Sequence, residues 1–204
     1  LLAGGVWAVA WLLLRGAPGP VRAAVCAAAP WLVTGFMHLD GYMDVCDAVL
    51  SRRDLPTRRR ILKDSHCGAF AVICMVLLAM GQWSLFLAAE DVSWLALLLI
   101  PAATRACAGL AVLGPRAGPM GTSQYAAMGP ARGGYGAALW VLLALSVGLP
   151  LWLDGSFGPL AAAAGYGLAV WYGFRNLDGM SGDISGFALT LGELCGCGAA
   201  ILWR

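Results

Sequence analysis

Long apolar runs dominate this chain and limit what it can fold into. Bilayer-spanning helices need roughly 17 to 25 residues, and apolar runs near that length cover residues 24–40, 67–89, 93–113, 136–153, 158–174 and 185–203. A shorter run covers residues 1–14. Only 12% of the residues are charged, whereas soluble domains carry about 25%. The sequence therefore predicts an all-α, polytopic integral membrane bundle of about six to seven transmembrane helices, with residues 1–204 forming a single domain.

The charged loops between these runs predict how the bundle is oriented. Residues 51–63 contain six arginine and lysine side chains, and short loops rich in these residues remain on the cytoplasmic side. Alternation of the helices then places residues 114–135 and 175–183 on that same side. We therefore expect a multi-pass protein of the bacterial inner membrane with one site facing the cytoplasm.

The acidic loops fall on the opposite side, at Glu90, Asp91 and Asp154. Arg15 and Arg22 also fall there, against the trend for basic residues, and a re-entrant or truncated first segment would explain them. Residues 1–14 have no start methionine and no cationic flank ahead of them. They are not expected to be a signal peptide, and we expect that an upstream portion is missing.

Three aspartates follow one another at helical spacing within HLDGYMDVCDA, residues 38–48. Asp40, Asp44 and Asp47 are spaced i, i+4, i+7, which places three carboxylates on one helix face. Acids at a membrane boundary are costly, and a hard divalent cation such as Mg²⁺ is a suitable partner that completes its shell with substrate phosphates. Gly41 would let a phosphate or a neighbouring backbone approach closely. The alternative is a solvated helix end whose acids pair with the arginine run at 52–60.

A second polar segment, Lys63 to His66, follows where the chain is expected to re-enter the membrane. Within it, Asp64 is a candidate metal ligand, and Lys63 is a candidate phosphate contact that would offset charge in phosphoryl transfer. Two histidines, His38 and His66, are present in the chain; each is either a packed structural residue or a general base or ligand. The arginine run has two interpretations as well: a topology signal that contacts anionic lipids, or a holder of a polyanionic substrate.

A third polar segment lies near the end of the chain, in RNLDGMSGDISGFALTLGE, residues 175–193. Glycine-rich backbone at membrane depth is tolerated only where it is buried in protein or lines a wet cavity. Asp183 precedes the last apolar helix, and Glu193 lies nearly three turns further along on roughly the same face. A buried glutamate needs a partner, and Arg105 is the expected one. That pair is either structural or part of a site.

Three blocks of this sequence resemble the cobalamin-5'-phosphate synthases, also called adenosylcobinamide-GDP ribazoletransferases. The blocks are HLDGYMDVCDA at 38–48, ILKDSHCGAF at 61–70 and GMSGDISGFALTLGE at 179–193. Three ordered blocks are more specific than a lone DGxxD. The sequence departs from the family pattern at Ala48, Asp178 and Ser181, where glycine, glycine and threonine are usual, and the serine keeps the hydroxyl group.

The resemblance implies the last assembly step of the cobamide nucleotide loop. The cobinamide-phosphate moiety of adenosylcobinamide-GDP would be transferred to α-ribazole or its 5'-phosphate, with release of GMP. Small-molecule substrates and the lipid bilayer are the expected partners, nucleic acid is not, and a complex with other late-pathway enzymes is left open. The implied site residues fall into three sets. The Mg²⁺ ligands would be Asp40, Asp44, Asp47, Asp64 and Asp183. The catalytic residues would be His38, Lys63 and Asp64. The substrate contacts would be Gly41, Ser65, Arg105, Ser181 and Glu193. Glu193 is open between metal, base and scaffold roles.

Two other classes compete with this interpretation. A CDP-alcohol phosphotransferase also places aspartates along a membrane helix, but its signature needs Ala-Arg where Met43 and Asp44 stand. A cation- or proton-coupled transporter would use intramembrane acids such as Asp40 and Glu193. Transport predicts acids spread along a path through the midplane, whereas most of these acids gather toward one face.

Overall fold

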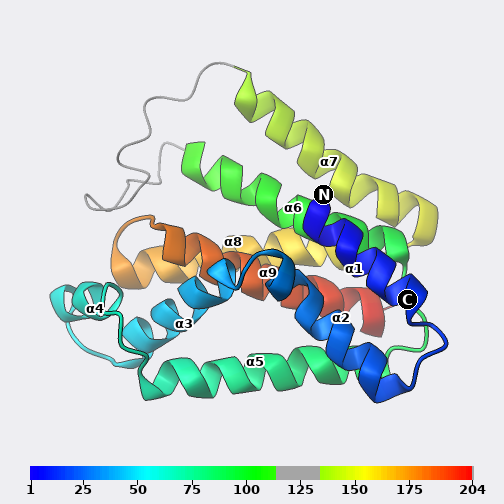
Figure 1. The fold of residues 1–204 in the computed structure, drawn as a ribbon. Coiled ribbons are helices and arrows are strands. Elements are labelled where there is room, and N and C mark those ends of the chain that lie inside the picture. The colour runs from blue at the N-terminus through cyan, green and yellow to red at the C-terminus, as the bar shows by residue number, and fades with distance from the viewer. Residues whose placement is uncertain (114–133, 204) are drawn as a thin grey trace.

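A computed structural model describes residues 1–113 and 134–203, and these residues form nine α-helices (Figure 1). The helices are α1 (Leu2–Leu13), α2 (Gly19–Val33), α3 (Met37–Leu50), α4 (Leu55–Ile61), α5 (Ala69–Ala88), α6 (Trp94–Leu113), α7 (Tyr135–Asp154), α8 (Gly158–Leu177) and α9 (Gly182–Leu202). The prediction of an all-helical membrane protein is confirmed.

Four of these helices, α5, α6, α7 and α9, are long and apolar enough to cross a membrane. A fifth span results if α2 and α3, which meet at a bend of 92°, are counted as one broken span. The expected six to seven spans also included residues 1–14 and 158–174. Residues 1–14 form α1, whose 12 residues are too few to cross a bilayer. Residues 158–174 form part of α8, which is not among the helices long and apolar enough to span a membrane.

The predicted apolar run at 24–40 is two helices rather than one. Gly35 and Phe36 both adopt left-handed backbone angles, with φ of 59° and 62°, and a helix cannot continue through such residues. Thr34 closes the end of α2, since its hydroxyl donates to the carbonyls of Pro30 and Trp31 at 3.0 and 3.2 Å. Because of this bend, α3 runs in a different direction from α2, and its acidic residues lie at one end of the bundle.

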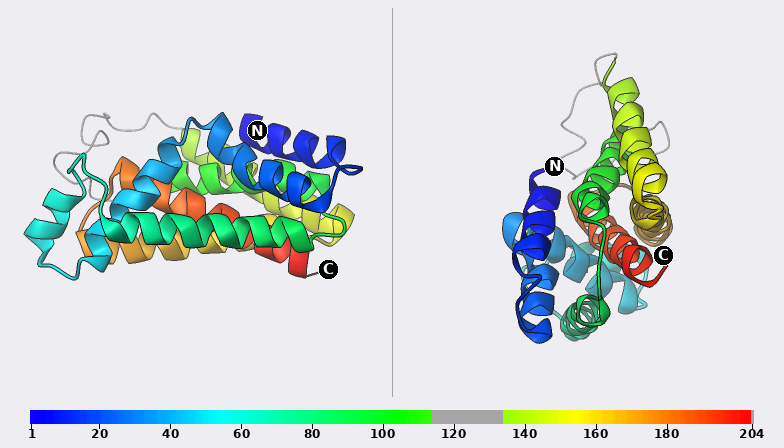
Figure 2. Two further views of the ribbon diagram at one scale, coloured as in Figure 1. Left: turned by 60° about the horizontal axis from the view of Figure 1, so that its bottom comes forward. Right: turned by 90° about the vertical axis from the view of Figure 1, so that its right-hand side faces the viewer.

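Helix α9 is the centre of the bundle and packs against α8, α3, α6 and α5 (Figures 1 and 2). Two groups of buried apolar side chains flank it. One joins α3 to the first turns of α9 and includes Val45 and Ile184. The other joins α1, α2 and α6 to the end of α9 and includes Trp7, Ile100 and Cys197. The core is thus divided between the two ends of the bundle.

The charged loops also separate by end. The arginine-rich segment contacts the end of α8, because Arg58 Nη1 donates to Asn176 Oδ1 at 3.1 Å. At the other end, Arg15 lies 3.6 Å from Asp91 and Arg22 donates to the Ala89 carbonyl at 2.9 Å. The shared end predicted for residues 51–63 and 175–183 is therefore confirmed (Figure 1). The third predicted member, 114–135, lies almost entirely outside the described residues.

Candidate active site

The acidic residues of α3 lie on one face of the helix, as their spacing predicts. Asp40 is exposed, and Asp44 and Asp47 are half-buried, whereas Val45 and Val49 on the other side of α3 are buried in the core. The helix therefore presents apolar residues to the bundle and carboxylates to a partly open surface. This arrangement confirms the helical face but does not by itself assign it a role.

Helix α9 adds a fourth carboxylate to this face. Asp183 lies in the first turn of α9, where the unpaired N–H groups of a helix favour negative charge. The charges of Asp40, Asp183 and Asp47 all act on Asp44, and the charge of Asp40 also acts on Asp183. We call these four side chains, Asp40, Asp44, Asp47 and Asp183, the carboxylate group.

Two glycines bring the helices of the carboxylate group together. A Cβ on Gly41 would stand 2.8 Å from the Cα and carbonyl oxygen of Asp183, and one on Gly186 would stand 2.9 Å from the His38 carbonyl oxygen. Real Cβ atoms do not approach backbone this closely, so α3 and α9 can cross at this distance only with glycine on both sides. Of the two roles predicted for Gly41, close approach of a neighbouring backbone is the one that the structure contains.

The salt bridges of the described residues do not include the carboxylate group. The salt bridges within residues 1–113 and 134–203 join Arg15 to Asp91, Arg59 to Asp178, His66 to Asp64 and Arg105 to Glu193. The alternative that the acids of α3 pair with the arginine run is thus not found in these ranges. Carboxylate oxygens suit Mg²⁺, so the donor type and the uncompensated charge fit that cation. However, no three His, Cys, Asp or Glu side chains of the described residues converge closely enough to form a finished metal site.

The segment that follows α4 approaches the carboxylate group through its backbone. A Cβ on Gly68 would stand 2.1 Å from the Asp47 carboxylate oxygens, so Asp47 lies directly against this glycine. Lys63 and Ser65 are exposed nearby in sequence. Gly68 was not among the predicted site residues, although its position between Cys67 and the start of α5 marks it as a close-contact or capping residue.

Asp64 is not among the charges that act on Asp44. Its carboxylate instead accepts from the His66 backbone N–H at 3.0 Å and lies 2.7 Å from His66 Nδ1. These hydrogen bonds lower the pKa of Asp64 below its ordinary value. The structure therefore places Asp40, Asp44, Asp47 and Asp183 near enough for their charges to interact, and it places Asp64 in a local pair with His66.

Glu193 and Arg105 form the predicted buried pair. Arg105 Nη1 donates to Glu193 Oε1 at 2.5 Å and to the Pro101 carbonyl at 3.1 Å, and Glu193 is only 5% exposed. Arg105 Nη2 also lies 3.5 Å from His38 Nδ1. Because a guanidinium can only donate, Nδ1 faces it as an acceptor. These contacts link α6, α9 and α3 inside the bundle and favour a scaffold role.

His38 faces away from the carboxylates of its own helix. At 3.6 residues per turn it lies about 200° around α3 from Asp40, and its side chain is directed toward Arg105 on α6. Its backbone carbonyl accepts from the Thr190 hydroxyl at 3.3 Å. Of its two predicted roles, the structural one is the one supported by these contacts.

Ser181 caps α9 from the turn before it. Its side-chain oxygen accepts from the Ile184 N–H at 3.2 Å, and its hydroxyl lies 3.4 Å from Asp183 Oδ2. Such a cap stabilises a helix by about 1 kcal/mol. Ser181 therefore fixes the helix end that carries Asp183, in addition to any contact with substrate.

Arg58 and Arg59 contact the end of α8 and the residue that follows it, although the sequence indicates only that they belong to a charge run. Arg59 Nε donates to the Leu177 carbonyl at 2.9 Å, and its Nη2 contacts the Asp178 carbonyl and, at 3.2 Å, the Asp178 carboxylate. Helix α4 thus holds the turn that leads to Asp183. Pro56 in the first turn of α4 is a helix-start signal that indicates a folded segment here.

Comparison with known proteins agrees with this architecture. Residues 1–201 match the family model described as Cobalamin-5-phosphate synthase. Proteins named adenosylcobinamide-GDP ribazoletransferase are similar over most of their length. The relative from Clostridium perfringens is 33% identical over 96% of this chain and 81% of its own, the one from Clostridium botulinum 32% over 100% and 83%, and the one from Thiobacillus denitrificans 35% over 92% and 79%. No solved structure matches the chain. On the family match and these identities, the chain belongs to the cobalamin-5-phosphate synthase family.

Proposed function

We propose that this protein is a magnesium-dependent membrane phosphotransferase that joins adenosylcobinamide-GDP to α-ribazole, or to α-ribazole 5'-phosphate, and releases GMP. The names of its relatives supply the reaction. The observation that carries the proposal on this chain is the carboxylate group, in which the charges of four acids of α3 and α9 interact and none of the four takes part in a salt bridge of the described residues.

In the proposed reaction a ribazole hydroxyl attacks the phosphorus attached to cobinamide. The bond from that phosphorus to the oxygen bridging to the guanosine phosphate breaks, and GMP leaves with that oxygen. The hydroxyl proton must pass to a base. Transfer between phosphates needs positioning and neutralisation of charge more than covalent help from the protein.

The carboxylate group would hold the cation, and Mg²⁺ bound there would neutralise oxygens of the pyrophosphate. Asp183, in the first turn of α9, would also bind this cation, and Gly41 keeps α3 close enough to α9 for Asp183 to take part. Lys63, exposed on the segment after α4, would offset charge on the transferred phosphoryl group, and Ser65 and Ser181 would contact substrate.

The base would be a carboxylate of the group rather than His38, because His38 is directed toward Arg105. Asp64, paired with His66, would order the 63–68 segment in place of the metal role first assigned to it. Arg105 and Glu193 would act as a scaffold between α6 and α9.

The proposed setting is the bacterial inner membrane, with the carboxylate group facing the cytoplasm. Support comes from the arginine-rich segment, which lies at the same end of the bundle as the turn before Asp183 and which the positive-inside tendency places in the cytoplasm. This cytoplasmic end of the bundle would then be accessible to other late-pathway enzymes that supply the substrates of the protein.

GMP release from the full-length protein in liposomes tests the proposal. We expect release that needs adenosylcobinamide-GDP, α-ribazole and Mg²⁺ together, falls at least about a hundredfold in Asp44→Asn, and persists in Asp54→Asn, an exposed aspartate outside the carboxylate group. A folded protein that releases no GMP would contradict the proposal. If the same liposomes conducted cations or protons, the transporter alternative would replace it.

A further inference from the structure

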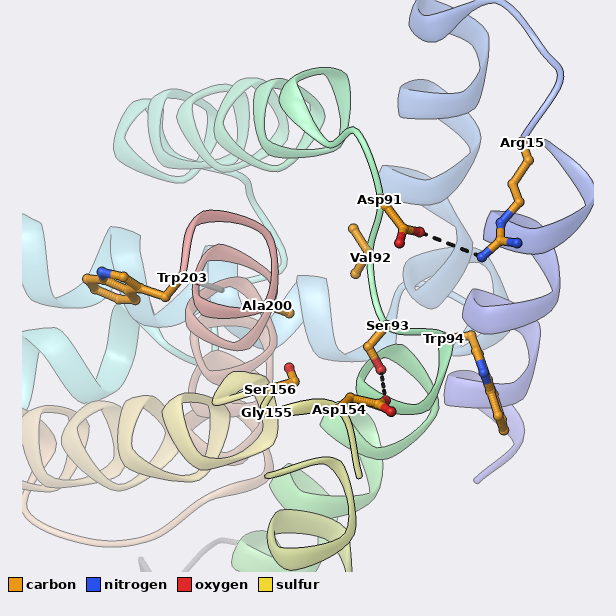
Figure 3. Close-up of a pocket in the computed structure, with 10 residues that line it drawn as sticks. All are labelled: Arg15, Asp91, Val92, Ser93, Trp94, Asp154, Gly155, Ser156, Ala200 and Trp203. Carbon is orange, nitrogen blue, oxygen red and sulfur yellow. Dashed lines mark hydrogen bonds and ion pairs between the residues drawn. The ribbon is translucent and has the colours of Figure 1, made fainter. Parts of the chain in front are cut away.

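The end of the bundle opposite the carboxylate group contains a polar cavity of about 420 Å³ (Figure 3). Three charged side chains line it, Arg15, Asp91 and Asp154. Arg15 reaches toward Asp91 at 3.6 Å, and the Ser93 hydroxyl donates to the Asp154 carboxylate (Figure 3). The cavity is therefore lined by one cationic and two anionic side chains. Arg15 follows α1, Asp91 lies in the connection between α5 and α6, and Asp154 ends α7.

This end carries exposed tryptophans, which are typical of a membrane–water interface. Trp94 and Trp203 both line the cavity, and Trp152 on α7 is 82% exposed. Tryptophan gathers at the level of lipid headgroups because its ring is apolar and its N–H is polar. A polar cavity at this depth lies where headgroups lie.

An apolar groove begins at the edge of the same cavity. Trp203 lines both the polar cavity and an apolar hollow of about 440 Å³ between α8 and α9. A second hollow of about 430 Å³ continues between the same helices. The lining residues here are spaced by four, at Phe187, Leu191, Cys195 and Ala199 on α9 and at Trp203 just after it. Such residues form one ridge that winds gradually around the helix.

The facing side of α8 repeats this spacing with Leu160, Ala164, Leu168 and Tyr172. The small side chain of Ala164 leaves the groove hollow between the larger ones. From Phe187 to Trp203 the groove follows α9 for about 24 Å. An apolar channel of this length that opens at its end into a polar cavity matches a lipid chain joined to a headgroup.

We propose that this cavity and groove together bind a phospholipid with a phosphoethanolamine headgroup. Arg15 would contact the lipid phosphate, Asp154 would accept from the primary ammonium, and an acyl chain would lie along the α8–α9 groove. Among the described residues that line the polar cavity, there is one more negative than positive side chain, which disfavours an anionic headgroup that lacks an ammonium. A trimethylated ammonium cannot donate to the Asp154 carboxylate, so phosphoethanolamine is favoured over phosphocholine.

Lipid retention by the full-length protein tests this proposal. The protein is stripped of lipid in detergent and mixed with phosphatidylethanolamine, phosphatidylglycerol and phosphatidylcholine of identical chains, and native mass spectrometry counts the bound lipids. We expect the wild type to retain phosphatidylethanolamine about tenfold more than either other lipid, as one or two charge-assisted hydrogen bonds allow.

Matched variants separate the headgroup from the chain. Asp154→Asn should remove the preference for phosphatidylethanolamine. Arg15→Ala should weaken retention of all three lipids, because each has the phosphate that Arg15 would contact, whereas Arg15→Lys should keep it. Arg53→Ala, at the other end of the bundle, should leave both retention and preference unchanged. Ala164→Trp should reduce retention of all three lipids by filling the groove. Glycerophosphoethanolamine should compete only weakly, since it lacks the chains.

Two outcomes would overturn the proposal. One is equal retention of the three lipids by the wild type, which would reduce the groove to ordinary contact with the bilayer. The other is a wild type that binds no lipid and forms dimers that Ala164→Trp separates, which would make the groove an interface between copies of this chain. Unchanged thermal unfolding of each variant verifies that it is folded.

Discussion

Two acids on the same helix, Asp183 and Glu193, have opposite surroundings. Asp183 lies half-buried in the first turn of α9 among three other carboxylates and has no basic partner in the described residues. Glu193, ten residues further along, is 5% exposed and is held by Arg105 at 2.5 Å. The lesson is that compensation, and not residue type, distinguishes a binding site from a scaffold. An acid that is already paired has little charge to offer a ligand, whereas four acids without a salt bridge among the described residues can offer theirs to a cation.

The largest expected effect on stability comes from breaking the compensated pair. Arg105→Ala leaves Glu193 buried without a partner, and losing one member of a buried pair destabilises by about 3–5 kcal/mol. Thermal unfolding in detergent should show a large drop for Arg105→Ala. Adding Glu193→Gln should recover most of it, because the buried charge is then gone. If the double variant were no more stable than Arg105→Ala, the pair would not be the scaffold described here.

The next effect comes from separating the uncompensated acids. Gly41→Ala would force α3 away from α9, since its Cβ meets the Asp183 backbone, and such overpacking costs about 1–3 kcal/mol. We also expect GMP release to fall about a hundredfold as the carboxylates move apart. Gly182→Ala is the matched control, because nothing lies within 4 Å of its Cβ position. Equal behaviour of the two variants would argue against close α3–α9 contact.

A smaller effect is expected from loosening the turn before Asp183. Arg59→Ala removes the hydrogen bonds to Leu177 and Asp178 and should cost about 1–2 kcal/mol. Proteolysis between α8 and α9 should accelerate in Arg59→Ala and not in Arg53→Ala, since Arg53 is exposed on the same charged segment. No difference between the two would show that α4 does not hold this turn.

The smallest effect concerns Asp64, the acid that the structure separates from the carboxylate group. His66→Ala should raise the pKa of Asp64 part of the way toward its ordinary value of 3.8, because it removes the His66 side-chain hydrogen bond, the largest cause of the lowering, and keeps the one from the backbone N–H. A depressed folded-state pKa contributes stability above that ordinary value and loses it as pH falls through the folded pKa. The variant should therefore be slightly less stable than the wild type near neutral pH, and this difference should disappear as pH falls below about 4. An NMR titration of the labelled carboxyl would record the change in the pKa of Asp64.

Local patterns predicted the elements of the site. The i, i+4, i+7 spacing predicted the acidic face of α3, and a buried acid in need of a partner predicted the Arg105–Glu193 pair. Both follow from helical periodicity and the cost of burying charge, which act within one helix or between obvious complements.

Features that depend on distant contacts were not predictable in this way. The break at Gly35 and Phe36 depends on backbone angles that an apolar run does not reveal. Arg59 and Leu177 are 118 residues apart in sequence, so nothing local indicates their contact. The spacing of charges along the chain could not show that Asp64 pairs with His66 while Asp183, far away in sequence, joins Asp44.

Binding of Mn²⁺, followed by electron paramagnetic resonance in detergent, tests the central claim most directly. Mn²⁺ takes the same oxygen ligands as Mg²⁺, and the full-length wild type should bind it and release it to excess Mg²⁺. Asp44→Asn should weaken binding at least about tenfold, and Glu193→Gln should leave it unchanged. Binding that survives Asp44→Asn, or that is lost in Glu193→Gln, would contradict the assignment of the cation site to the uncompensated acids of α3 and α9.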